Sequence, residues 1–510
     1  MSGLYPTMTR EQSFHVDGWR ERHPHLITMN QHFRQQGFRT VGLGKIYHGT
    51  SGKGVDPDNW DQWINIEASE YAKRENNDIA RAARLKGEIG NARDPAKGPL
   101  TESADVHDNT YADGKRAARV VELLQGYAEA KDKTPFFLAV GLTKPHLPFV
   151  APQKYWDLYQ RDSFKMPPNK GVPPGYPEYA SNQMAFEMHK YSDFEGKSPK
   201  DFSDQLNGRL LHGYAACVSY IDASIGRILN SLEETGLSKN TIVVVLSDHG
   251  WKLGDYGWWC KHTSNEIDTR VPFIVKAPNA KGNGKRSAAL VELVDLYPSL
   301  CELAGIPTPG HLEGFSLVPL LAQPHLKWKK AAFSIWSSPT PKYIGHSLRN
   351  DRYRYTEYRK VQANDIISRE LYDHGNGSSL VDENLATNPK YKQLMNQLSK
   401  QLHDGYRSAL PDNAISYSGG GSGKTRFVLI NPKQLAGLGS EDANQSVKSE
   451  LKKMNTLADR IMKDKTSYTV TFNNGKNQAF RNNYFSIGPY WWPNPDTDNG
   501  LPYVRKDGQV

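Results

Sequence analysis

The chain has 510 residues, 37% of them hydrophobic, and a mean hydropathy of −0.67. No apolar stretch reaches the ~20 residues of a membrane-spanning helix, and at roughly 100–200 residues per domain the length allows about two to four domains. The formal net charge of +9 is not gathered into a Lys/Arg run, so we expect neither a nucleic-acid nor a membrane partner, whereas an acidic polysaccharide would suit the positive balance.

The first predicted elements are a helix and a strand within residues 28–48. The strand delivers Lys45 and His48 at its carboxyl end. Residues 50–110 are polar and weakly periodic, and we interpret them as a long insertion or substrate-side loop. Apolar residues at helical spacing then predict a helix over 115–131.

A second buried strand is predicted over 135–142. It runs into a loop in which prolines 145 and 148 flank His146, and the fixed φ of proline would hold this histidine in place. The following residues, 151–205, are rich in Pro and Tyr with little periodicity, which predicts a long surface excursion.

The best defined helix–strand unit comes next. Apolar steps of three and four residues predict a helix over 210–232, and the run 242–246 predicts a strand buried on both faces, as in a parallel sheet. This strand stops at Asp248 and His249, with Lys261 downstream. A carboxylate beside an imidazole suits a divalent metal, and Lys261 could face an anion held by that metal.

Three predicted strands thus end in a histidine or lysine. Taken singly, each such residue is more often an ordinary exposed loop residue. Ligands bind at the carboxyl ends of the strands in open α/β sheets, so three such ends on one rim indicate a functional site.

The second half of the chain predicts a smaller unit. A short strand over 270–276 is followed by Asp295, which looks like the N-cap of a helix. Residues 325–405 contain a hairpin pattern with its turn at 350–351 and a helix over 389–402.

A Gly/Ser-rich stretch, 411–424, predicts a flexible linker, and residues 425–510 follow it. The cysteines, Cys217, Cys260 and Cys301, are widely spaced, so neither a zinc site nor a disulfide framework is indicated.

The motifs above resemble the formylglycine-dependent sulfatases, most closely the iduronate-2-sulfatase-like branch. The residues that carry the resemblance are Lys45, His48, Lys144-Pro145-His146, Ser247-Asp248-His249-Gly250 and Lys261. It implies an α/β fold with an alkaline-phosphatase-like, mostly parallel sheet flanked by helices over 1–324, and a smaller C-terminal α+β subdomain over 325–410.

The resemblance also implies roles at the site. Asp248 and His249 would bind calcium, and Lys45, Lys261 and Lys144 would bind the substrate. His48 would support the hydrated formylglycine, and His146 would be the acid for the leaving alcohol. Sulfuryl transfer needs cations around the oxygens that carry charge, and a poor leaving alcohol needs a proton donor.

One part of the family pattern is missing. Ser2-Gly3-Leu4-Tyr5-Pro6 looks like the tail of the Cys/Ser-x-Pro-Ser-Arg signature that supplies formylglycine. The nucleophile is therefore expected upstream of Met1, and we expect the chain as given to be inactive. The family implies a periplasmic or secreted protein, although no signal peptide is recognisable in this chain.

Residues 425–510 resemble the start of an alginate lyase family domain, a partial α-helical toroid, on the residues 484–493 and 500–510. Together the two resemblances imply a sulfatase acting on a sulfated, uronate-containing polysaccharide. Two alternatives stay open: a non-catalytic polysaccharide-binding remnant, and a phosphate or phosphonate ester hydrolase on the same fold.

Overall fold

The structure is a computed structural model, and it describes residues 1–11, 18–48, 56–87, 95–169, 171–181, 187–338, 342–361, 363, 365–381 and 383–411. Almost all of the predicted linker 411–424 and the whole lyase-like segment 425–510 lie outside the described residues.

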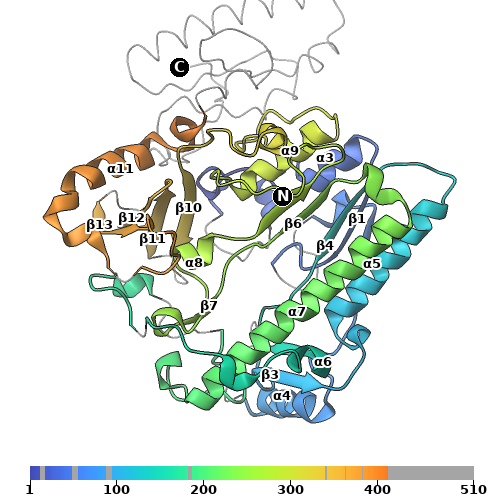
Figure 1. Cartoon of the computed structure of the whole chain (residues 1–510), viewed down its shortest axis with the longest axis horizontal. Coiled ribbons are helices and arrows are strands. Elements are labelled where there is room, and N and C mark those ends of the chain that lie inside the picture. The colour runs from blue at the N-terminus through green and yellow to red at the C-terminus, as the bar shows by residue number, and fades with distance from the viewer. Residues whose placement is uncertain are drawn as a thin grey trace, which may run out of the picture.

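The described helices and strands follow one another from the N-terminus to residue 404 (Figure 1). The α-helices are α1 (Pro6–Thr9), α2 (Trp19–Arg22), α3 (Met29–Gln35), α4 (Arg74–Lys86), α5 (Ala112–Glu129), α6 (Gln153–Trp156), α7 (Asp204–Glu234), α8 (Glu266–Thr269), α9 (Leu296–Leu303), α10 (Val318–Ala322) and α11 (Lys392–Asp404). The strands are β1 (Arg39–Gly44), β2 (Gln62–Ile64), β3 (Thr101–Ala104), β4 (Phe136–Gly141), β5 (Phe149–Pro152), β6 (Val243–Leu246), β7 (Lys252–Leu253), β8 (Trp259–Cys260), β9 (Phe273–Lys276), β10 (Ala332–Ser337), β11 (Tyr343–Arg349), β12 (Tyr353–Lys360) and β13 (Ile366–Asp373).

A parallel sheet of order β2-β1-β4 forms the middle layer. One face packs on α3 and α9 through a cluster that includes Phe33, Phe137 and Tyr297. The other face packs on α5 and α7, where Leu43 meets Val120. Figure 1 shows α5 and α7 running side by side along the sheet. The predicted helix–strand–helix–strand order of this layer is confirmed.

The polar stretch 50–110 is more regular than predicted. It supplies the edge strand β2, the helix α4 and the strand β3, which pairs in parallel with β5. In α4 only Ala80 is buried, so the helix carries no apolar stripe that the sequence could reveal. Its start is held instead by the Glu102 carboxylate, which accepts hydrogen bonds from the backbone N–H groups of Ala72 and Lys73 at 2.7 and 3.1 Å.

The prediction for the strand at 242–246 is wrong in two respects. β6 pairs antiparallel with β9, because the chain reverses direction through residues 247–272 and then runs back alongside β6 as β9. Its faces are also incompletely covered: Leu246 is 38% exposed and Ile274 on β9 is 61% exposed. The preceding helix α7 is confirmed but begins earlier than predicted, at the Ser203 hydroxyl, which accepts from Leu206 N at 3.1 Å.

The C-terminal unit is an antiparallel sheet of order β10-β11-β12-β13 with α11 packed on one face. The predicted hairpin is confirmed as β11 and β12, whose turn contains Asn350. Asp295 lies at the N-cap position of α9, but its carboxylate does not cap the helix. It accepts instead from Phe315 N at 2.7 Å and from the buried Lys329 ammonium at 2.6 Å.

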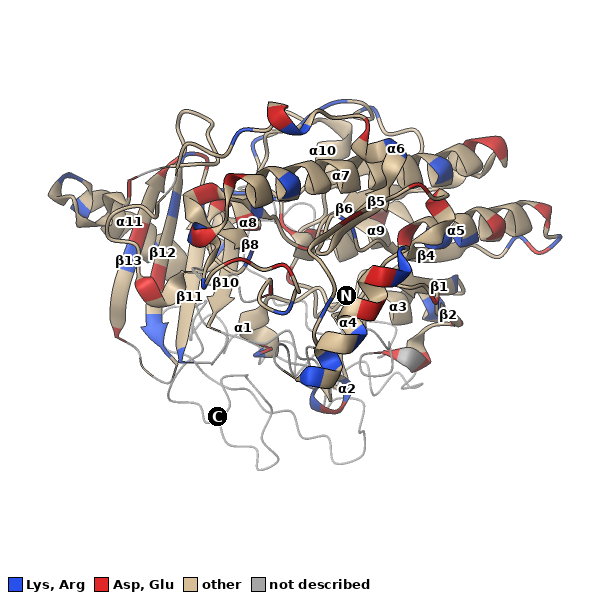
Figure 2. Cartoon of the chain, turned by 90° about the horizontal axis from the view of Figure 1, so that it is seen from below, with Lys and Arg blue, Asp and Glu red and all other residues tan. Residues whose placement is uncertain are grey.

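Charged residues of both signs are spread along α4, α5 and α7 (Figure 2). Of the helices in the described residues, none combines the length and apolarity needed to cross a membrane.

A buried ion pair joins the two units. The Glu266 carboxylate on α8 accepts hydrogen bonds from Arg354 Nη2 at 2.8 Å and from Arg349 Nε at 3.0 Å, both on the C-terminal sheet. Burial would raise the pKa of Glu266, but the two guanidinium charges lower it to about 2.

We expect the Glu266→Gln variant to lose about 3 kcal/mol of unfolding free energy at pH 7, because it leaves two buried guanidinium groups without their carboxylate. The native pKa of about 2 lies below the ordinary value of 4.5, so this stabilisation is present above pH ~4.5 and is lost as the pH falls toward 2. Urea unfolding from pH 7 to pH 3 measures the difference. The exposed Glu302→Gln is the control, and an equal effect of both variants would contradict the assignment.

Candidate active site

Two glycines fix the position of Lys45. Gly44 has φ +76° and a β-carbon there would lie 2.0 Å from the carbonyl oxygen of Gly141. At Gly141 a β-carbon would lie 2.2 Å from the backbone of Lys45. The ends of β1 and β4 can therefore approach closely, and Lys45 N donates to Gly141 O at 2.9 Å.

Lys45 reaches across to the end of β6. Its ammonium donates to Asp248 Oδ2 at 2.7 Å, and Asp248 Oδ1 lies 3.7 Å from His249 Nε2. The Asp248 side chain is 62% exposed, so an oxygen donor, an imidazole and an ammonium meet at an open edge. The structure thus brings together the two residues predicted to bind metal and one predicted to bind sulfate.

The position of Gly250 in the Ser-Asp-His-Gly motif has no room for a side chain. A β-carbon at Gly250 would lie 1.8 Å from the carbonyl oxygen of Ile267, and Gly250 N donates to Asp268 O at 2.8 Å. The Asp268 carboxylate also forms a buried ion pair with Lys252 and accepts from Thr263 N at 2.8 Å. Residues 250–268 are therefore closed into a loop by backbone contact and by a buried ion pair.

Left-handed backbone conformations are concentrated in this loop. Tyr256, Cys260 and His262 have φ values of 60°, 69° and 79°. Such conformations cost of order 1–3 kcal/mol each in residues with a side chain, and they persist where the surroundings impose them. Two of them flank Lys261, so the backbone on both sides of this lysine is held in an uncommon shape.

His146 lies in the loop after β4, which contains cis peptide bonds before Pro145 and Pro148. The Lys144 ammonium points back into this loop and donates to His146 O at 2.9 Å and to Pro148 O at 2.6 Å. In the structure Lys144 thus stabilises the loop, and its role toward substrate stays a prediction.

The indole of Trp251 is the surface on which the site is assembled. His146 contacts it edge-on at 5.1 Å, His249 lies 6.2 Å from it, and the Lys261 ammonium lies 5.0 Å from the ring centre. Residues from the β4 loop and the β6 loop therefore meet around one buried ring.

Glu187 completes the group. Lys261 Nζ lies 2.8 Å from His146 Nε2 and 2.8 Å from the Glu187 carboxylate. His262 Nε2 lies 2.7 Å from Glu187 Oε1, and His146 Nε2 lies 3.1 Å from Oε2. Burial would raise the pKa of Glu187, but its hydrogen bonds with His146 and His262 and the charge of Lys261 hold it well below its ordinary value.

Sequence reasoning missed Glu187, Trp251 and His262 as parts of the site. Glu187 lies in the weakly periodic excursion 151–205, where no pattern marks it. His48 is exposed beyond Lys45, and its predicted role stays a prediction.

The three cysteines are buried. The Cys217 thiol accordingly belongs to the main hydrophobic cluster, as its place on the helical stripe predicts. Burial raises the pKa of Cys260 well above its ordinary value although Lys261 is adjacent, which leaves the thiol in its unreactive form.

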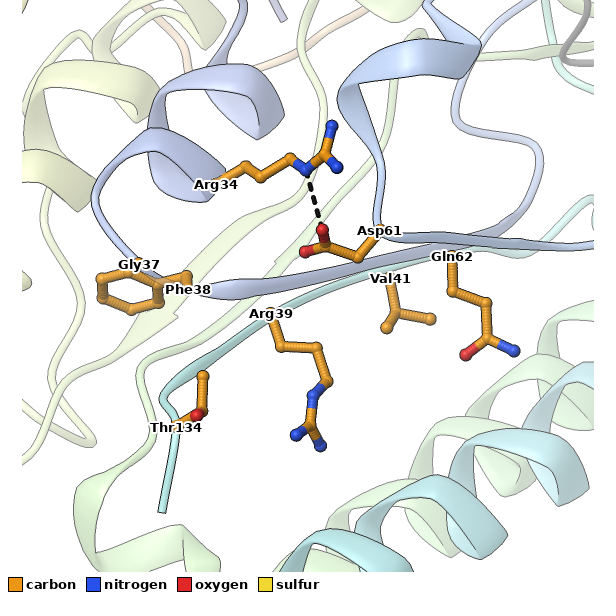
Figure 3. Close-up of a pocket in the computed structure, with 8 residues that line it drawn as sticks. All are labelled: Arg34, Gly37, Phe38, Arg39, Val41, Asp61, Gln62 and Thr134. Carbon is orange, nitrogen blue, oxygen red and sulfur yellow. Dashed lines mark hydrogen bonds and ion pairs between the residues drawn. The ribbon is translucent and has the colours of Figure 1, made fainter. Parts of the chain in front are cut away.

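A hollow of about 720 Å³ lies at the opposite end of the sheet (Figure 3). It is lined by residues at the start of β1 and before β4, and Arg34 Nε donates there to Asp61 Oδ1 at 2.7 Å. The predicted site residues do not line it, so we do not assign the chemistry to this hollow.

Calcium takes six to eight oxygen ligands. The open edge supplies Asp248 and His249, and no group of three or more His, Cys, Asp or Glu that could hold a metal occurs among the described residues. These two side chains alone do not fit a calcium site.

Comparison with known proteins gives two matching family models. The model described as Sulfatase matches residues 1–306, and the one described as N-sulphoglucosamine sulphohydrolase, C-terminal, matches residues 254–408. Iduronate 2-sulfatase of Mus musculus is 29% identical over 474 residues, which cover 78% of this chain and 83% of that protein.

Solved structures share the fold. A phosphonate monoester hydrolase from Silicibacter pomeroyi has a TM-score of 0.61 at 19% identity and covers 82% of this chain and 86% of its own. A protein in complex with its substrate D-glucosamine-2-N,6-O-disulfate has a TM-score of 0.56 at 20% identity and covers 79% of this chain and 86% of its own. These matches confirm the predicted alkaline-phosphatase-like α/β fold.

We expect Gly250→Ala to lower the unfolding free energy by about 1–3 kcal/mol, because the new methyl group would overlap the backbone of Ile267. At Gly126 in α5 a β-carbon would meet nothing within 4 Å, so Gly126→Ala should instead raise stability by roughly 0.5–1 kcal/mol. Urea unfolding of both variants measures the contrast. A stable Gly250→Ala variant would show that the loop does not depend on this contact.

Proposed function

Because the chain belongs to the sulfatase family of sulfuric ester hydrolases, we propose that its site removes sulfate from a sulfated, uronate-containing carbohydrate. The observation that carries this proposal is the meeting of Lys261, His146 and His249 around Trp251, at the carboxyl ends of the strands.

The two lysines would bind the sulfate group. Lys45 follows β1 and lies 2.7 Å from Asp248, whereas Lys261 comes from the loop 250–268 and lies 2.8 Å from His146. Cations arranged in advance around an anion stabilise the oxygens that carry charge in the transition state. Lys45 and Lys261 would therefore hold sulfate oxygens on two sides.

His146 would protonate the sugar oxygen as it leaves the sulfur. Its Nε2 faces Lys261 and Glu187, whereas its Nδ1 lies 3.0 Å from Leu147 O. A backbone carbonyl accepts only, so Nδ1 carries a hydrogen and Nε2 is the atom that exchanges the catalytic proton.

The family's chemistry also uses a formylglycine nucleophile and a metal ion, and the described residues do not supply a complete site for either. A hydrated formylglycine, which the family resemblance implies, would supply the oxygen that attacks sulfur. The three buried cysteines are not placed for that role. The location of the nucleophile upstream of Met1, the inactivity of the chain as given and the role of calcium stay predictions.

The substrate class is supported by the relatives. One is an iduronate 2-sulfatase, and one solved structure holds a disulfated glucosamine. A net charge of +9 also favours polyanionic substrates. A periplasmic or secreted location and a lyase-like segment at 425–510 complete the proposal.

The alternatives are distinguished by substrate. Phosphonate and phosphate esters are the alternative substrates, because the fold is similar to that of a phosphonate monoester hydrolase. Faster turnover of an aryl phosphonate than of the matching aryl sulfate would favour that chemistry. Saturable binding of sulfated polysaccharide without sulfate release would favour a binding remnant.

We expect His146→Gln to slow sulfate release from a sulfated uronate disaccharide by about 10²–10⁴-fold, because the sugar alkoxide leaves poorly without a proton. The loss should be much smaller with 4-nitrophenyl sulfate, whose leaving group needs no proton. Released sulfate is measured with calcium, for this chain and for a form that carries the Cys/Ser-x-Pro-Ser-Arg signature upstream.

The exposed His25→Gln is the matched control and should leave both rates unchanged. Equal losses on the two substrates would exclude His146 as the proton donor. Absence of sulfate release from both unmodified forms would overturn the proposed activity.

A further inference from the structure

We propose that Glu187 and Lys261 form a two-partner proton switch for His146, in which Glu187 holds the protonated imidazole and Lys261 holds the neutral one. Glu187 is then a positioning residue that acts through His146. The inference deepens the proposed function and rests on the role given there to His146.

The switch follows from what each partner can donate. An ammonium group only donates hydrogen bonds, so Lys261 can bond His146 Nε2, 2.8 Å away, only when that nitrogen is unprotonated. A carboxylate only accepts, so Glu187 Oε2, 3.1 Å away, can bond the same nitrogen only when it is protonated. Both states of the ring therefore find a partner without any movement of the chain.

The other ring nitrogen stays constant. His146 Nδ1 lies 3.0 Å from Leu147 O and donates to it in both states. The ring plane is further fixed by Trp251, which His146 contacts edge-on. Only the proton on Nε2 changes.

Glu187 is held in place from two sides. It is 8% exposed, its Oε1 lies 2.7 Å from His262 Nε2, and both of its oxygens lie 2.8 Å from Lys261 Nζ. The carbonyl of His262 accepts in turn from Trp336 Nε1 at 2.7 Å, on the C-terminal sheet. The carboxylate is therefore a fixed charge and not a flexible surface group.

The charged groups that face His146 act on its pKa in opposite directions. Burial lowers the pKa of His146, the hydrogen bond with Glu187 raises it, and the positive charge of Lys261 lowers it. Lys144, from the same loop, donates to the backbone carbonyl of His146. Without Glu187, a protonated His146 would lose the carboxylate oxygen at 3.1 Å and would still lie 2.8 Å from the Lys261 ammonium.

In the proposed step, one proton passes from His146 to the leaving sugar oxygen. The Nε2–H bond of His146 breaks as an O–H bond forms on the departing sugar oxygen, and the imidazole becomes neutral. Lys261 then donates to the freed nitrogen. Glu187 keeps its negative charge throughout.

The test is an NMR titration of the His146 ring in the full chain, with ¹³C-labelled histidine and the His146→Gln variant to assign the signal. Glu187→Gln should lower the pKa of His146, and Lys261→Met should raise it. The control Glu178→Gln makes the same carboxylate-to-amide change at an exposed residue, and it should leave the pKa of His146 unchanged.

Unchanged titration in both variants, or shifts in the same direction, would overturn the switch. If Glu187→Gln does not fold, Lys261→Met still gives a decisive sign, and Glu187→Asp lengthens the contact without removing the charge. The titration needs no turnover. Opposite shifts, together with no sulfate release from either this chain or the form that carries the upstream signature, would refute the proposed activity alone. Sulfate release without these shifts would refute the switch alone.

Discussion

The buried ion pair between Lys252 and Asp268 is the constraint on which the site depends. It closes a loop whose left-handed residues, among them Cys260 and His262, are conformationally unfavourable on their own. The free energy of that closure, with the tight contact at Gly250, is what holds Lys261 in place. The lysine can present a charge at a fixed point because the strain of its neighbours is offset elsewhere in the loop.

Buried polar contacts also join the loop 250–268 to the C-terminal sheet. Glu266 meets two arginines of the C-terminal sheet, and Trp336 of that sheet bonds the backbone of His262. A buried carboxylate that loses its cation leaves an uncompensated charge, so each pair restricts the segments it joins. The C-terminal sheet is thus part of the structure that orders Lys261, although it contributes none of the residues predicted to bind sulfate or metal.

Much of the site could be predicted from the sequence, because the end of a buried strand is visible as the point where an apolar run gives way to polar residues. Lys45, His146 and Asp248 follow apolar runs, and the carboxyl ends of such strands form one rim in this class of sheet. Glu187 could not be predicted, because it follows no periodic segment and is brought to Lys261 only by tertiary structure. The same limit applies to α4, which buries one side chain, and to the antiparallel pairing of β6, which depends on how the long loop returns.

The contact between Glu266 and its two arginines also bears on how genes of this family can recombine. Position 324 looks like a natural joint, since it lies between the end of α10 at Ala322 and the start of the C-terminal sheet at Ala332. A crossover at that joint would place Glu266 from one parent against the residues at 349 and 354 from the other. Chimeras should therefore inherit loop and sheet together, and the exchangeable block that keeps both intact runs from the start of the loop at 250 to the end of β13 at Asp373.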